Sequence, residues 1–114
     1  MMESLEQTGN ADSSGERILI EAPPGLPRQL VVGYLGRCRE NAREAQAAVK
    51  RGDYGKAEVL GHRMKGSGCS YGFPDVTVHG AAIEQAAKRQ AAGEAEAAVA
   101  RLEAYLRLVE IAGA

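Results

Sequence analysis

The chain has 114 residues, which is enough for one compact domain and too few for two. Hydrophobic residues make up 45% of the sequence and charged residues 25%, a globular composition. With 14 Lys and Arg against 15 Asp and Glu, the formal net charge of −1 provides no basic field for a nucleic-acid backbone or an anionic membrane. Because aromatics are only 4% and no apolar run could cross a bilayer, we expect neither nucleic-acid binding nor membrane insertion.

Residues 1–17 are rich in Ser, Asn, Gly and acidic side chains, and they lack the pattern of a secretory signal. They are predicted to form a disordered tail or linker, followed by a folded domain over residues 18–114. Cys38 and Cys69 are too few for a disulfide framework, so we expect reduced thiols and a cytoplasmic location. One apolar stripe per helix is adequate for a monomer.

The first predicted helix follows a short extended arm at residues 18–20 and three prolines between residues 22 and 28, which prevent an earlier helix. Its apolar positions recur at helical spacing and form one stripe: Val31, Leu35, Cys38, Ala42, Ala45 and Val49. The helix is expected to end at Lys50 and Arg51, whose charges suit its carboxyl end, with Gly52 just beyond. Asp53 then suits the cap of a second helix that begins near Tyr54.

A third helix is expected to begin around Pro74, which suits a first turn. Its apolar stripe consists of Val76, Gly80, Ile83 and Ala87. Gly93 interrupts the pattern before a fourth helix, which carries Ala95, Val99, Leu102, Leu106 and Val109 on one side. No segment after residue 20 alternates like a strand. Four amphipathic helices with short connections predict an all-α fold, an antiparallel four-helix bundle.

The segment from Gly61 to Gly72 carries the chemistry. If the second helix continues through it, Ala57, Leu60, Met64, Ser67 and Tyr71 form the buried face. His62, Lys65, Gly66 and Cys69 then lie on the opposite, solvent-facing side. A solvated imidazole can act as a nucleophile, and an ammonium group one turn away can neutralise an anion attached to it. The alternative is that the helix ends near Lys65 and a Gly-Ser loop follows.

The glycines of this segment do not fit a nucleotide site. Gly61 and Gly66 have the spacing of a P-loop, but Ser67 stands where that loop requires Lys. A dinucleotide-binding fingerprint also fails, since its third glycine would fall on Tyr71 and no strand precedes the segment. Gly66 instead leaves no side chain above the imidazole, which would let another protein approach it.

The run His62-Arg63-Met64-Lys65-Gly66-Ser67 resembles the His-x-x-Lys-Gly-Ser/Ala signature of histidine-containing phosphotransfer (HPt) domains of bacterial two-component phosphorelays. The order and spacing of the predicted elements are similar over residues 22–112. The first helix, which ends at residues 51–53, is similar to that of the family. The third helix is similar too, and it ends in Glu84-Gln85-Ala86-Ala87. The pair Gly68-Cys69 departs from the family, because small Ser, Ala or Gly residues are common there.

The resemblance implies a four-helix bundle, often with a short additional N-terminal helix. It implies that His62 accepts a phosphoryl group from the aspartyl phosphate of one receiver domain and passes it to another. Lys65 would stabilise the phosphoryl oxygens, and Gly66 would keep the ring accessible. The expected partners are the receiver domains of response regulators or hybrid histidine kinases.

Phosphoryl transfer depends mainly on in-line positioning and charge stabilisation. A small bundle with one histidine can supply the acceptor and one cation, so we expect a phosphocarrier without an ATP site, not an enzyme. No cofactor is expected to bind this chain, and the Mg²⁺ of the reaction would come from the receiver.

The main alternative is a helical adaptor that docks receiver or kinase domains without carrying phosphate. A metal site built from Cys38, His62, Cys69 and His79 is disfavoured, because His62 and Cys69 are too far apart for chelation within one turn. A nucleophilic enzyme based on Cys69 lacks an orienting third residue. His79 is expected to have a packing or surface role.

Overall fold

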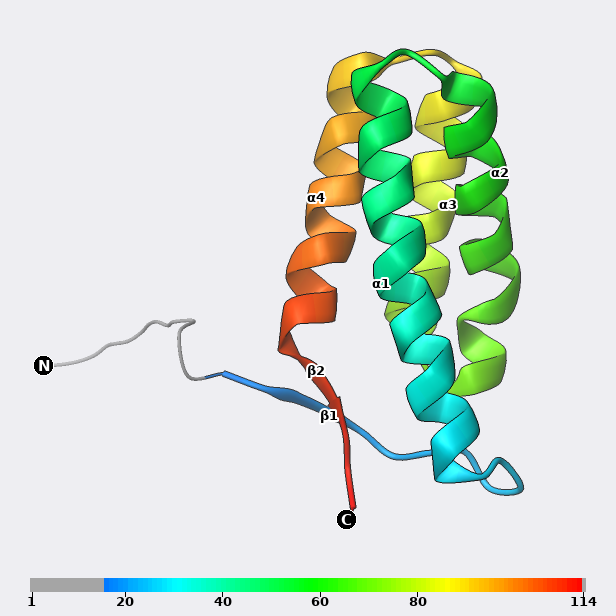
Figure 1. Ribbon diagram of the computed structural model, residues 1–114, viewed down its shortest axis with the longest axis vertical. Coiled ribbons are helices and arrows are strands. Elements are labelled where there is room, and N and C mark those ends of the chain that lie inside the picture. The colour runs from blue at the N-terminus through cyan, green and yellow to red at the C-terminus, as the bar shows by residue number, and fades with distance from the viewer. Residues whose placement is uncertain (1–15, 114) are drawn as a thin grey trace, which may run out of the picture.

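In a computed structural model that describes residues 16–113, four helices form an antiparallel bundle (Figure 1). The elements in chain order are β1 (Ile18–Ile20), α1 (Arg28–Lys50), α2 (Tyr54–Ser67), the short 3₁₀ turn η2 (Cys69–Tyr71), α3 (Pro74–Lys88), α4 (Ala92–Leu108) and β2 (Val109–Ile111). Both α1 and α3 pack against α2 and α4, so the helices close around one core. The predicted all-α bundle is confirmed.

The core consists of the apolar stripes that helical spacing predicts. Every residue of the stripes predicted for the first, third and fourth helices is buried. Phe73, just before α3, is fully buried, and Tyr34 of α1 lies between it and Tyr71. The Tyr34 and Tyr71 rings stack at 4.2 Å between centroids, and the Tyr34 hydroxyl is 2.7 Å from Ser67 Oγ. These contacts tie α1 to the end of α2.

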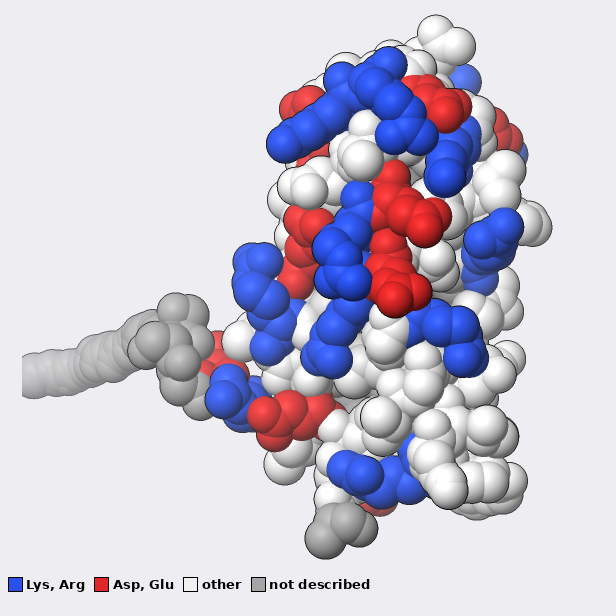
Figure 2. All heavy atoms as spheres, in the orientation of Figure 1, with Lys and Arg blue, Asp and Glu red and all other residues white. Residues whose placement is uncertain are grey.

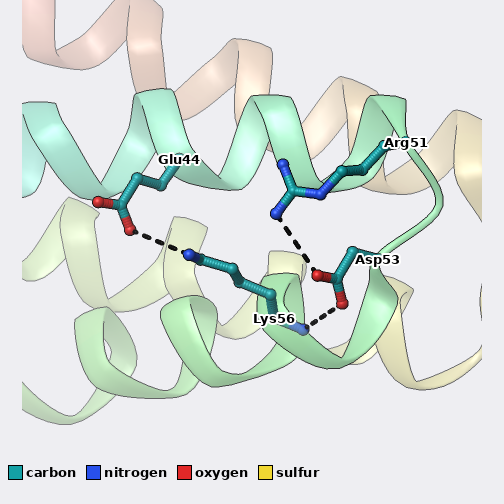
Figure 3. A network of polar contacts seen from close by, with 4 residues as sticks. All are labelled: Glu44, Arg51, Asp53 and Lys56. Carbon is teal, nitrogen blue, oxygen red and sulfur yellow. Dashed lines mark hydrogen bonds and ion pairs between the residues drawn. The ribbon is translucent and has the colours of Figure 1, made fainter.

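The α1–α2 connection forms as predicted (Figure 3). Gly52 takes a φ of +77°, which favours glycine, directly after the end of α1. Asp53 caps α2, where its Oδ1 accepts a hydrogen bond of 3.2 Å from the backbone N–H of Lys56. Two ion pairs cross the connection, Arg51 to Asp53 at 3.4 Å and Lys56 to Glu44 at 3.9 Å. Together these contacts fix the start of α2.

The prediction that no strand follows residue 20 is wrong. Val109, assigned to the stripe of the fourth helix, is buried but lies in β2 with extended backbone. β1 and β2 pair in parallel, with Ile18 opposite Val109 and Ile20 opposite Ile111, and the Ala112 N–H donates to the Ile20 carbonyl. β-branched residues favour strands, but a partner strand so distant in sequence leaves no trace in the local periodicity. Among the described residues before α1, the chain forms β1 and a turn, without the additional helix.

Two helix boundaries also differ from the predictions. α2 ends at Ser67 and a 3₁₀ turn follows, so the helix neither continues to Tyr71 nor stops at Lys65. α4 begins at Ala92, so Gly93 lies in its first turn and does not interrupt the pattern. The break before α4 occurs instead at Gln90, which has a φ of +55°.

The predicted tail lies outside the described residues, except for its last two. Of these, Arg17 forms an ion pair with Glu110 of β2 at 2.7 Å. On the face seen in Figure 2, basic and acidic side chains are interleaved and do not form a field of one sign. Within residues 16–113, no helix combines the length and the apolarity that a membrane span requires.

Candidate functional site

His62 lies in the middle of α2 on its solvent-facing side. The residues of α2 that face the core are Ala57, Leu60, Gly61 and Met64. Helical geometry therefore turns His62 outward, and 68% of its side chain is exposed. The predicted exposure of this ring is confirmed.

The buried carboxylate of Glu84, on the neighbouring helix α3, lies beside this ring. Only 5% of the Glu84 side chain is exposed. Its Oε2 is 2.9 Å from His62 Nδ1, and its Oε1 is 2.7 Å from Lys65 Nζ. Lys88, one turn further along α3, has its Nζ 3.9 Å from Oε2. The site is therefore one carboxylate surrounded by two side chains from α2 and one from α3.

The charge of Glu84 determines the orientation of the imidazole. The hydrogen bond from Lys65 and, next, that from His62 hold the pKa of the Glu84 carboxyl below its ordinary value, despite the opposing effect of burial. Glu84 is thus ionised at neutral pH and can only accept hydrogen bonds. The Nδ1–H of His62 must be the donor, so in the neutral ring Nε2 carries the free lone pair.

Lys65 and Gly66 lie next to the ring, as the helical spacing predicts. Lys65 is 39% exposed, and its ammonium group binds Glu84. Gly66 is exposed, and a Cβ built on it would meet nothing within 4 Å. Nothing inside the chain therefore requires a glycine at position 66, and the space beside the imidazole is open.

Glu84 is the site residue that the sequence analysis did not single out. It follows Ile83 and lies one turn after Gly80, which places it on the buried side of α3. A carboxylate on a buried helix face needs a cationic or hydrogen-bonding partner. A charged residue on an otherwise apolar helix face was therefore the signal that the sequence offered. It does not show which residue is the partner of the carboxylate.

The other residues considered for chemistry are not brought together. Cys38 is buried in the core of α1, where burial raises the pKa of its thiol. Cys69 is exposed in η2, and its backbone N–H donates to Thr77 Oγ1 at 2.9 Å. His79 is half-buried on α3, with its ring 6.1 Å from that of Tyr105. No group of three or more potential metal ligands occurs within residues 16–113.

Comparison with known families agrees with this architecture. The model of the Hpt domain family matches residues 29–112, a range that reaches from the start of α1 to just past β2. The chain belongs to the Hpt domain family. Hpt domains are phosphotransfer carriers of two-component systems, not enzymes, and they interact with receiver or kinase partners. Searches of curated proteins and of solved structures give no significant match.

Proposed function

We propose that this chain carries a phosphoryl group on His62 Nε2, accepts it from the aspartyl phosphate of one receiver domain and passes it to the aspartate of another. The observation that supports this proposal most directly is the contact of 2.9 Å between His62 Nδ1 and the buried Glu84 carboxylate. It fixes the proton on the inner nitrogen and leaves the outer nitrogen free to attack phosphorus.

The transfer step balances without the loss of a proton. The Nε2 lone pair forms the N–P bond while the P–O bond to the donor aspartate breaks, and its electron pair returns to the aspartate carboxylate. Nε2 carries no proton beforehand, so none has to leave. The ring retains its Nδ1–H and becomes cationic, and Glu84 stabilises this charge at 2.9 Å. Transfer to the second receiver reverses each of these changes.

Lys65 and Gly66 have separate roles in the proposal. The Lys65 ammonium group has three donors, so it can keep its contact of 2.7 Å with Glu84 and still donate to a phosphoryl oxygen on the ring. Gly66 leaves open space beside the imidazole, which allows the receiver to bring its aspartate in line with Nε2.

The partner supplies the remainder of the chemistry. Glu84 is already engaged by His62 and Lys65, so the proposal assigns the Mg²⁺ ion and the acidic pocket around it to the receiver domain. The chain is then a carrier, without an ATP site or a turnover of its own. Cys38 and Cys69 are both free thiols, as a cytoplasmic domain would have, and the proposed carrier acts as a monomer.

The test uses a panel of receiver domains from the same genome, each charged with labelled phosphate. We expect the wild type to gain an acid-labile, alkali-stable phosphate that a second receiver can remove. His62→Gln should gain none. His79→Gln is the matched control, because His79 is the only other histidine in the chain, and it should be labelled like the wild type. Equal labelling of His62→Gln would overturn the proposal, and receiver binding without any transfer would favour the adaptor.

A further inference from the structure

The contact between α2 and α3 is a close approach of two backbones. A Cβ built on Gly61 would lie 2.7 Å from the Glu84 backbone N and 2.8 Å from the Gly80 carbonyl oxygen. A Cβ on Gly80 would lie 2.6 Å from the Lys65 backbone N. Backbone atoms cannot move aside as the end of a flexible side chain can, so any side chain at these positions would force the helices apart.

A third glycine continues the same contact. A Cβ on Gly68, directly after α2, would lie 2.6 Å from the Thr77 backbone N. We call Gly61, Gly68 and Gly80 the glycine seam. Its contacts share one antiparallel register, so residue numbers rise along α2 as they fall along α3. The residues that lie opposite one another are Gly61 and Glu84, Lys65 and Gly80, and Gly68 and Thr77.

This register places the reactive cluster. Glu84 lies opposite Gly61, and His62 is the next residue of α2. Lys65 lies opposite Gly80, one turn further along, so the imidazole and the ammonium group each reach a different oxygen of the carboxylate. Glu84 lies 2.9 Å from His62 and 2.7 Å from Lys65. Both distances are typical of short hydrogen bonds, so a wider separation of the helices would break these contacts.

We propose that Gly61 and Gly80 are positioning residues for phosphoryl transfer: they set the separation between α2 and α3 at which Glu84 can hold the proton on His62 Nδ1. This inference rests on the proposed function of His62. It differs from the role of Gly66, which faces open space and affects only the approach of a partner.

The test combines the imidazole tautomer with the transfer rate. We expect ¹⁵N NMR of the wild type to show neutral His62 as the Nδ1–H tautomer. Gly61→Ala and Gly80→Ala should give a mixture of both tautomers and slow phosphoryl transfer by about tenfold to a hundredfold, because a small displacement at a reacting centre has effects of that size. Gly36→Ala is the matched control, since a Cβ at this helical position of α1 meets nothing within 4 Å.

A double-mutant cycle separates positioning from general destabilisation. If Gly61 acts through the carboxylate, Gly61→Ala should slow transfer far less in a Glu84→Ala background than in the wild type. Equal fold-losses in the two backgrounds would overturn the inference.

Glu84→Asp provides a test that leaves the glycines intact, should the alanine variants fail to fold. It withdraws the carboxylate by one methylene group and should reproduce the tautomer mixture. A wild-type tautomer and transfer rate in Glu84→Asp would contradict the proposed role of the helix separation. The tautomer measurement requires no phosphate, so it tests the glycine seam even if His62 proves not to be phosphorylated.

Discussion

Glu84 Oε2 lies 2.9 Å from His62 Nδ1, although the two residues are 22 positions apart and belong to different helices. One of the pair is largely exposed and the other is almost fully buried. The buried partner is the ionised one, so it imposes an orientation and a protonation pattern on the exposed ring. The site thus combines an exposed imidazole with a buried carboxylate that holds its inner nitrogen.

Removal of the Glu84 charge should slow transfer without preventing it. In Glu84→Gln the side chain can still accept from Nδ1–H, but it no longer stabilises the cationic ring of the phosphorylated state. Glu84→Ala loses both effects and should reduce the transfer rate by about tenfold to a hundredfold, with the Gln variant in between. Rapid-quench transfer assays measure this order. Wild-type rates in a folded Glu84→Ala would show that the carboxylate has no part in the reaction.

Lys65→Ala should still fold but be less stable than the wild type, because it removes the ammonium group that lies 2.7 Å from the buried Glu84 carboxylate. Loss of its ammonium group removes a donor to the phosphoryl oxygens, so transfer should weaken or the phosphohistidine should hydrolyse faster. Lys88→Ala is the control, since its Nζ is 3.9 Å from Glu84 and its loss should have a smaller effect. If Lys65→Ala changes neither the transfer rate nor the phosphohistidine lifetime, Lys65 is a bystander.

A bulky residue at position 66 should block the partner and leave the fold intact. Gly66→Leu places its side chain in space that the chain leaves empty, so the far-UV CD signal should stay close to that of the wild type. Transfer should be slower in both directions. Gly66→Ala serves as the graded control, and because Gly66 lies in the last turn of α2 its stability should stay within about 1 kcal/mol of the wild type. Unchanged rates in a folded Gly66→Leu would refute the access argument.

The stability of the domain should fall on acidification through His79. Burial lowers the pKa of His79, an effect that nearby Asp75 partly opposes. The unfolded chain therefore binds a proton at a higher pH than the folded chain, and the free energy of unfolding decreases as the pH drops below the ordinary histidine pKa. His79→Gln should flatten this dependence in urea titrations between pH 7.5 and 5. The same slope in the variant and the wild type would assign the effect to other groups.

Local signals in the sequence predict most of the bundle. Helical spacing identifies the buried stripes. Gly52 and Asp53 mark the boundary between α1 and α2, because glycine favours the position just past a helix end and Asp favours the N-cap of the next helix. The strand at Val109 is different, because its partner lies at Ile18 and no local pattern records that pairing. Gln90 likewise makes the turn before α4, where Gly93 is the more obvious candidate.

The sequence predicts the α2 residues of the candidate site but not the contact with Glu84. His62, Lys65 and Gly66 follow one another along a single helix, so their arrangement is a matter of helical geometry. The contact with Glu84 depends on how closely α2 approaches α3 and in which register. That approach depends on glycines whose importance appears only when the backbones are seen in contact.

The most direct test of the account identifies the phosphorylated nitrogen. The ¹⁵N-labelled protein is treated with phosphoramidate as a small-molecule donor, and long-range ¹H–¹⁵N and ³¹P spectra are recorded. The account predicts one phosphohistidine at His62, with phosphorus on Nε2 and the proton on Nδ1. Phosphorus on Nδ1 of His62, or on another residue, would contradict it.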